Sequence, residues 1–300
     1  PIDFPDKPLR FVVGFPPGGP NDLLTRLIAP GIGERLKRNV VVENRAGSNG
    51  EIAAASVAKS PADGGVFMLA SNGSTTVAAA LKKNLPYDIR KDFAAVAPVG
   101  INPMLLVVRP DLPAGNVAEL IALARAKPGK LNGASAGAGG ATHLGLELLK
   151  SLAKIDIVHV PYKGGGPAMA DLMASLVDIY FGGLSTALPH VRAGKLRALG
   201  QTGAKRSAAA PDIPTIGETL PGYECAISYG VFLPAGAPQA LVDKLHAAVD
   251  DTVRSAEVTR KFTELGADPQ FGTPAEFAAY VAADLDKWTR LAKEANLHID

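Results

Sequence analysis

Short apolar runs alternate with amphipathic stretches along most of the chain. Residues 9–15 are almost continuously apolar and β-branched, which is typical of a strand buried on both faces. A turn of prolines and glycines follows, and then a helical pattern that Pro30 and the glycines at 31 and 33 are expected to kink or end early. The same pattern predicts further strands at 40–43, 66–71, 104–109, 155–160, 177–181, 196–201 and 226–233. It predicts further helices at 52–59, 75–83, 117–127, 142–152, 168–176, 186–192, 239–254, 256–265 and 274–295.

This alternation of strands and helices predicts an α/β protein with mostly parallel sheets flanked by helices. The strands fall into two sets, and the chain crosses between them near 101–104 and 223–233. We therefore expect two lobes: residues 1–102 plus 226–300, with the C-terminal helices, form lobe 1, and residues 103–225 form lobe 2. Prolines flank both crossings, so bending is expected to be confined to short hinge segments.

Composition narrows the function classes. The 300 residues are 47% hydrophobic and 20% charged, as in soluble globular chains, and the net charge of +2 gives no large electrostatic footprint for nucleic acid. A single cysteine, Cys225, excludes an intramolecular disulfide framework and a multi-cysteine metal site. The five histidines show no ligand spacing, so we expect no metal site and no cofactor.

No segment is apolar enough, over enough residues, to cross a membrane. The most apolar charge-free stretch, residues 93–108, contains Pro98 and Pro103 and is shorter than the roughly 20 residues that a bilayer requires. The chain opens on Pro1 without an initiator methionine, which is expected of a trimmed or mature form and is compatible with a targeting segment that has been removed.

One motif indicates hydrolase chemistry. Residues 133–137, Gly-Ala-Ser-Ala-Gly, match the nucleophile elbow of α/β hydrolases, with Ser135 as the nucleophile. That elbow needs a strong strand immediately before it, and residues 128–132 supply only one large apolar side chain. No glycine run suited to an oxyanion hole is recognisable either. A catalytic Ser135 is therefore an alternative rather than the preferred interpretation.

Glycine-rich loops at three predicted helix starts, 18–19, 137–140 and 164–166, indicate an anion site, because free N–H groups at a helix N-terminus attract anions. None matches a nucleotide-binding fingerprint. Asp22 either caps its helix or contacts the ligand, and His143 contacts the ligand or shapes the loop. His159 is expected to be a core or edge residue, and Lys163 is either a solvated loop residue or a charge facing the ligand.

A set of short motifs, in order along almost the whole chain, resembles the solute-binding proteins of tripartite tricarboxylate transporters, the TctC or Bug family of periplasmic receptors. The motifs are 4–10 (FPDKPLR), Gly18-Gly19 with Asp22, 43–47 (ENRAG), 85–88 (LPYD) with 92–93, 128–131 (PGKL), 135–144, 160–165 (VPYKGG), 193–199 (AGKLRAL) and 234–238 (PAGAP). The resemblance implies a two-lobed Venus-flytrap fold that binds a small carboxylate in the cleft between the lobes, largely through main-chain N–H groups.

The resemblance also implies a function and a set of contacts. It implies a periplasmic, monomeric receptor that delivers its ligand to membrane permease subunits, with no catalytic residue and no nucleic-acid partner. Two alternatives remain open, an esterase built on Ser135 and a carboxylate sensor for a signalling partner. Pro17, Gly140, Tyr229 and Pro30-Gly31 depart from residues common in the family. The ligand-binding residues implied are Phe15, Pro17, Gly18, Gly19, Asp22, Ser71, Asn72, Gly73, Ser135, Gly137, Gly139, Thr142, His143, Tyr162, Lys163, Gly164, Ser185 and Tyr229.

Overall fold

The computed structural model describes residues 1–299, and these form two compact units. Unit 1 contains Pro1–Ile101, Ser228–Ala292 and Ile299, and unit 2 contains Asn102–Ile227 and Lys293–His298. The chain therefore passes from one unit to the other at 101–102 and returns at 227–228. That these units are the two domains expected above stays a prediction.

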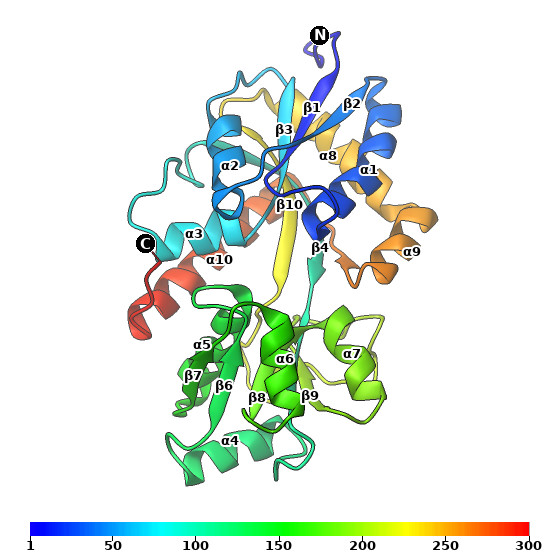
Figure 1. Cartoon of the computed structure of the whole chain (residues 1–300). Helices are drawn as coiled ribbons and strands as arrows, with labels where there is room; N and C mark the ends of the chain where they lie inside the picture. The colour runs from blue at the N-terminus through cyan, green and yellow to red at the C-terminus, as the bar shows by residue number, and fades with distance from the viewer. Residues whose placement is uncertain (300) are drawn as a thin grey trace. The chain divides into compact units, whose positions relative to one another are not determined.

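Unit 1 is built on a six-stranded sheet with the order β11-β4-β10-β3-β1-β2 (Figure 1). Its strands are β1 (Leu9–Val13), β2 (Val40–Asn44), β3 (Val66–Ser71), β4 (Phe93–Asn102), β10 (Ile227–Pro234) and β11 (Asp268–Pro269). β1 runs parallel to β2 and to β3, whereas β10 is antiparallel to β3 and β11 is antiparallel to β4. Three parallel strands therefore end at the same edge of this sheet.

Helices cover both faces of the three parallel strands, with α1 and α8 together on one side and α2 on the other (Figure 1). β1 and β3 are rich in Val, Leu and Phe because both of their faces are buried, and the ring centroids of Phe11 and Phe67 lie 4.6 Å apart in the core. The helices are α1 (Pro20–Leu36), α2 (Glu51–Ala58), α3 (Ala78–Leu81), α8 (Gln239–Arg254), α9 (Ala256–Glu264) and α10 (Pro274–Glu294), with two short turns, η1 (Ser48–Gly50) and η2 (Gly73–Val77).

The expectation that Pro30 and Gly31 interrupt the first helix is wrong, since α1 continues to Leu36. Packing outweighs the lost hydrogen bond, because α1 buries Leu24, Ile28 and Ile32. Gly31 also lets α8 approach closely: a Cβ at Gly31 would lie 2.5 Å from the Thr252 methyl group.

Unit 2 contains a five-stranded sheet with the order β7-β6-β8-β5-β9. β6 runs parallel to β7 and to β8, and β5 is antiparallel to β8 and to β9. The strands are β5 (Met104–Val108), β6 (Asn132–Ser135), β7 (Val158–Pro161), β8 (Ile179–Gly183) and β9 (Arg197–Gln201). The other elements are α4 (Val117–Ala126), α5 (Ala141–Ala153), α6 (Gly165–Met173), α7 (Leu184–Arg192) and the short turn η3 (Ile216–Glu218).

The α/β class is confirmed, but both sheets are mixed rather than mostly parallel. In the first sheet β10 is antiparallel to β3, with Tyr229 opposite Ser71, so β10 begins at the edge at which the parallel strands end. β7 begins at Val158 rather than at Ile155, because Ile155 still donates its N–H to Lys150 O at the end of α5. Among the described residues, no helix combines the length and the apolar character that a membrane span requires.

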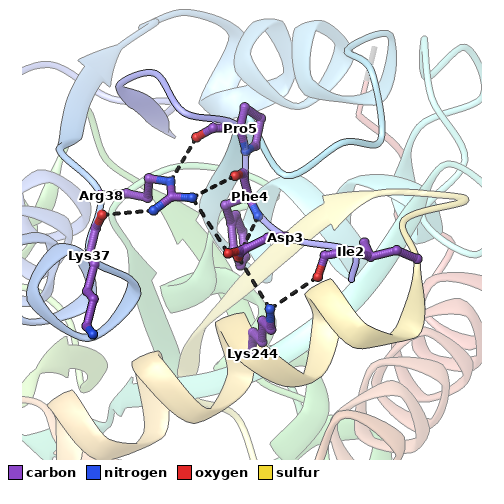
Figure 2. Close-up of polar contacts among 7 residues, drawn as sticks. All are labelled: Ile2, Asp3, Phe4, Pro5, Lys37, Arg38 and Lys244. Atoms are coloured by element: carbon purple, nitrogen blue, oxygen red, sulfur yellow. Dashed lines mark hydrogen bonds and ion pairs between the residues drawn. The ribbon is translucent and has the colours of Figure 1, made fainter.

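The N-terminal segment is tied to both α1 and α8 (Figure 2). Arg38, just after α1, donates from Nε to Pro5 O and from Nη2 to Phe4 O, each at 3.0 Å. Lys244 of α8 donates to Ile2 O at 3.1 Å and lies 3.3 Å from the Asp3 carboxylate. Between these cations the Phe4 ring is 3% exposed. The segment therefore connects α1 and α8 through an aromatic anchor as well as through charges.

We predict that Phe4→Ala lowers the free energy of unfolding by about 3 kcal/mol, since it removes a buried ring and leaves a cavity. Ile2→Ala is the control, because Ile2 is 54% exposed and its loss is expected to change stability by less than about 0.5 kcal/mol. Urea titration followed by circular dichroism measures both variants. Equal midpoints for the two variants would show that the segment does not contribute to the fold.

Candidate functional site

Three loops of unit 1 meet where its parallel strands end. We call them the unit 1 loop cluster: residues 14–22 after β1, 45–50 after β2 and 72–74 after β3. Glycines allow their close contact. A Cβ at Gly14 would lie 2.6 Å from Gly50 Cα, and a Cβ at Gly50 would lie 3.2 Å from both Phe15 Cε2 and Ser74 Cβ. The carboxyl edge of parallel strands is where α/β proteins commonly bind ligands.

Asp22 holds the first of these loops in shape. One carboxylate oxygen accepts the Gly18 N–H at 2.9 Å, and the other accepts Arg26 Nε at 2.9 Å and Asn44 Nδ2 at 2.8 Å. Burial alone would raise the pKa of Asp22, but the hydrogen bonds from Asn44, Gly18 and Arg26 outweigh it and lower the pKa. The carboxylate is 2% exposed, so its main role is to cap and shape the loop.

The N-terminus of α1 keeps main-chain donors available. Its N-cap is Gly19, which has no side chain to cap the helix, and Pro20 has no N–H. The first intrahelical bond runs from Leu23 N to Gly19 O at 2.9 Å, so the N–H groups of Asn21 and Asp22 have no acceptor within the helix. These donors and the helix dipole together favour an anion.

The predicted residues after β3 are mostly buried. Asn72 N donates to Ser228 O at 2.9 Å, and Ser228 N donates to Asn72 Oδ1 at 3.3 Å. Tyr229 pairs with Ser71 across β10 and β3 and is 2% exposed, and burial raises its pKa. These buried side chains therefore support the loops from within the protein, whereas Gly73 is only half-buried.

Unit 2 brings together loops that follow its own three parallel strands. We call them the unit 2 loop cluster: residues 136–143 after β6, 162–164 after β7 and 184–186 after β8. The first two loops are joined by main-chain bonds, from Tyr162 N to Ser135 O and from Gly164 N to Ala136 O, each at 2.9 Å. Ser185, in the first turn of α7, is exposed.

Most amides of the glycine loop before α5 are already used within unit 2. Gly140 N lies 3.4 Å from Gly137 O, and Gly140 is the N-cap of α5, without a side-chain cap. The N–H groups of the first turn, 141–143, have no acceptor within the helix. Three other loop amides donate to side chains of the same cluster: Ala136 to Thr142 Oγ1 at 2.8 Å, Gly137 to Ser135 Oγ at 3.3 Å and Gly139 to His143 Nδ1 at 2.9 Å.

The same local arrangement occurs in both clusters. In each, the residue before the N-cap is a glycine at positive φ, +95° at Gly18 and +80° at Gly139. Its N–H donates to the side chain four residues later, Asp22 or His143, in the first turn of the helix. The loop is thus fixed by a side chain that leaves the helix amides free. By contrast, α4 is capped conventionally, because Asn116 accepts the Glu119 N–H at 2.8 Å.

His143 is in turn held by Glu147 and Lys150. Since its Nδ1 accepts the Gly139 N–H, the ring carries its proton on Nε2 and donates it to Glu147 Oε1 at 3.2 Å. Lys150 Nζ lies 3.1 Å from the same oxygen. Burial would raise the pKa of Glu147, but the hydrogen bond from His143 and the charge of Lys150 outweigh it and lower the pKa. Glu147 therefore positions the loop through His143.

Ser135 is bonded to a histidine that the sequence did not connect with it. Ser135 Oγ lies 2.6 Å from His159 Nε2, and the His159 ring stacks on His143 with centroids 3.8 Å apart. The serine is 0% exposed, and its Oγ also accepts the Gly137 N–H. The distance suits a serine–histidine pair, but no carboxylate within residues 1–299 hydrogen-bonds to His159, and the Oγ has no solvent access.

The remaining predicted residues of unit 2 have different surroundings. Tyr162 donates its hydroxyl proton to Asp171 Oδ2 at 2.7 Å, and this bond, with burial, raises the pKa of Tyr162 to about 12. Lys163 is exposed beside that tyrosine. In the described part of the chain, no three side chains of His, Cys, Asp or Glu lie close enough together to hold a metal ion.

Sequence reasoning missed Asn44, Glu147 and His159 as part of these clusters. Glu147 follows His143 by four residues, and this helical spacing was a readable signal. His159 could be assigned only from the register that pairs it with Gly133. It lies on an edge strand, as expected, but its bond to Ser135 gives it a role in the loop.

We predict a pH dependence of stability that depends on His159. Burial, which disfavours the charged form of the ring, lowers the pKa of His159 to about 4. The unfolded chain binds that proton near pH 6.5, so the free energy of unfolding falls as the pH is lowered from about 6.5 to about 4. His159→Gln removes this contribution, and urea midpoints measured across that range are expected to fall less steeply. His298→Gln, at an exposed position, is the control; parallel curves for His159→Gln and the wild type would contradict the prediction.

Comparison with known proteins identifies the family. Residues 24–297 match the model of the tripartite tricarboxylate transporter family receptor, TctC. A protein of Pseudomonas sp. strain P51, encoded in the tcbD-tcbE intergenic region, is 36% identical over 98% of this chain and 88% of its own length. BugT of Bordetella pertussis is 32% identical over 97% of this chain and 90% of its own length.

Two solved structures cover nearly the whole chain. Rpa4515 of R. palustris with adipate is 36% identical, with a TM-score of 0.77, and covers 99% of each chain. MatC (Rpa3494) of Rhodopseudomonas palustris with bound malate is 33% identical, with a TM-score of 0.72, and covers 96% of this chain and 99% of that one. The expected two-lobed periplasmic-binding-protein fold is confirmed by these structures. The chain belongs to the TctC family of tripartite tricarboxylate transporter receptors, which includes the Bug proteins.

Proposed function

We propose that this chain is a periplasmic receptor that binds a small organic carboxylate and delivers it to the membrane subunits of a tripartite tricarboxylate-type transporter. Family membership supports the receptor role, and the adipate and malate complexes of two relatives support the ligand class. The observation that carries the proposal within this chain is the pair of glycine N-caps, Gly19 and Gly140. The glycine before each N-cap donates its N–H to a side chain in the first turn of the helix, which holds the loop and leaves the helix amides available.

A carboxylate offers several lone pairs to N–H donors, and the first turns of α1 and α5 offer such donors without competition from a capping side chain. We propose that the N–H groups of Gly19, Asn21 and Asp22 in unit 1, and those of 141–143 in unit 2, are the main-chain contacts. Because the donors are fixed before binding, little conformational entropy is lost on ligand capture.

The buried Asp22 carboxylate lies in the loop that is proposed to take an anion, so its charge has to be compensated. Arg26 Nε at 2.9 Å supplies a full positive charge, and the Gly18 amide and the Asn44 side chain supply further donors. In unit 2, Lys163 is exposed beside the loop and adds a positive charge that attracts anions.

The other residues implied by the family resemblance are proposed to act in two ways. Phe15, Pro17, Gly73, Thr142 and Ser185 contact the ligand or its water shell. The residues that hold the loops, since their polar groups are engaged within the protein or buried, are Gly18, Ser71, Asn72, Ser135, Gly137, Gly139, Tyr162, Gly164 and Tyr229.

A second candidate function, ester hydrolysis by Ser135, is favoured by one observation, the 2.6 Å distance between Ser135 Oγ and His159 Nε2. It ranks below the receptor because the serine is fully buried. We predict that the purified protein does not hydrolyse a p-nitrophenyl ester panel faster than Ser135→Ala does. Turnover that disappears in Ser135→Ala would establish the hydrolase instead.

For the receptor we predict that Gly19→Asn abolishes ligand binding while it stabilises the fold. The backbone of Gly19 has the extended N-cap conformation, φ −79° and ψ 169°, and a Cβ there would meet nothing closer than 3.9 Å. An asparagine fits, and its side-chain oxygen takes the amides of the first turn. Asparagine at this N-cap is expected to raise the free energy of unfolding by a few tenths of a kcal/mol relative to glycine.

Thermal unfolding with adipate, malate and other small carboxylates measures the effect. Ligand at a hundredfold excess over Kd stabilises the wild type by about 2.7 kcal/mol, and Gly19→Asn loses this gain. Asn116→Gly, the opposite exchange at the N-cap of α4, is the control and is expected to keep it. Undiminished ligand stabilisation in Gly19→Asn would contradict the role of the α1 amides, and no response of the wild type to any carboxylate would contradict the function.

A further inference from the structure

The outer edge of β2 carries main-chain groups that no other strand uses. Leu9 N donates to Asn39 O at 2.7 Å, and Arg45 N donates to Val13 O at 2.8 Å. In a parallel pair with this register, alternate residues face the partner strand, so Val41 and 43 bond to β1. The N–H and C=O groups of Val40, Val42 and Asn44 therefore point away from the sheet.

β2 is the last strand of its sheet, beside α1 in Figure 1. Within residues 1–299, no main-chain hydrogen bond reaches the outward groups of Val40, Val42 or Asn44. Exposed edge strands are usually blunted by a proline, a bulge or a covering element, because they pair readily with other chains. Three consecutive valines without a proline leave this edge open to another strand.

A groove of about 770 Å³ runs along this edge and is entirely within unit 1. Val40 and Val42 form one wall, and the small residues Ala29, Pro30 and Gly33 of α1 form the other. No large apolar side chain lines this groove, so the space beside the strand is open. Pro30 also lacks an N–H, which leaves the carbonyl of residue 26 without its helical donor.

The positive charge of the groove favours an acidic binding partner. Its lining includes three cationic side chains, Arg26, Lys37 and Arg38, against one carboxylate, Glu34. Arg26 is paired with the buried Asp22 at 2.9 Å, so the cations that attract an acidic segment are Lys37 and Arg38. Arg38 directs its bonds to the main-chain carbonyls of residues 4 and 5, so its charge is only weakly compensated by Asp3 at 3.7 Å. A second copy of this chain would bring like charges together, whereas an acidic segment would be attracted.

We propose that the edge of β2 binds an extended acidic segment of the transporter's membrane subunit, which adds a strand to the sheet. The identity of that partner rests on the proposed function, whereas the site rests on the edge, the groove and the charges. Main-chain bonds to Val40, Val42 and Asn44 hold the segment, and every second side chain faces the small residues of α1. Lys37 and its neighbours contact the acidic side chains.

Val42→Pro in the full chain tests the proposal, because it deletes an outward donor without touching the bonds to β1. The probe is a short fluorescein-labelled peptide in which glutamate alternates with valine, and its lysine counterpart is the charge control. Fluorescence anisotropy is expected to show that the wild type binds the acidic peptide at least roughly tenfold more tightly than the basic one. Val42→Pro loses this binding, whereas Val42→Ile, which keeps the N–H, retains it.

Lys37→Glu is the second variant, since it changes an exposed charge and leaves the strand intact; it is expected to weaken binding of the acidic peptide. Equal affinity for both peptides, no binding of the acidic peptide or undiminished binding by a folded Val42→Pro would overturn the proposal. So would light scattering that shows a dimer of this chain broken by Val42→Pro. Carboxylate stabilisation is measured on the same samples: its absence, with peptide binding intact, refutes the proposed function and leaves the edge site standing.

Discussion

In each unit, three neighbouring parallel strands have to end at one edge of the sheet, and each is followed by a turn into a helix or a short helical turn. This constraint brings several helix N-termini, with their unsatisfied N–H groups, to a single edge. A side chain can satisfy these groups, as Asn116 does at the start of α4. α1 and α5 have glycine at that position instead, so the donors stay available and the loops need another means of support.

That support has the same geometry in both units but different chemistry. Asp22 and His143 each accept an N–H from a glycine four residues earlier. A carboxylate in one unit and a neutral imidazole in the other therefore hold the loop before the helix in the same way. Because both side chains are buried, each needs further hydrogen-bond partners. Arg26 and Asn44 stabilise the Asp22 charge, while Glu147 fixes the proton of His143 on the far ring nitrogen. The Ser135–His159 bond also supports the loop after β6, since Ser135 is fully buried and accepts the Gly137 N–H.

The sequence predicted most of what local pattern controls. The long C-terminal helices and the buried strand 9–13 follow directly from apolar periodicity, and α8 spans 239–254 as predicted. Tertiary packing decided the rest. α1 continues through Pro30 because Gly31 permits contact with Thr252, which no local rule shows. Likewise, the glycine loops were visible in the sequence, but the partners Asn44 and His159 depend on strand register, which a single sequence does not reveal.

α1 shows how one element combines several departures from local rules. Its N-terminus has a glycine where a capping side chain is usual, its middle has a proline that leaves one carbonyl free, and its C-terminus ends in Lys37 at a left-handed φ of 54°. Each departure costs helix stability, and burial of one face of α1 against the sheet and α8 offsets the cost. Each also leaves something available for binding. Gly19 leaves the first amides of the helix without a cap, Pro30 forms part of the wall of the groove, and Lys37 places a positive charge at the end of the helix. Departures from local rules are concentrated where a protein binds something. On α1 the first two lie at proposed contact surfaces, and the third, at Lys37, lies next to Arg38, which bonds to the N-terminal segment.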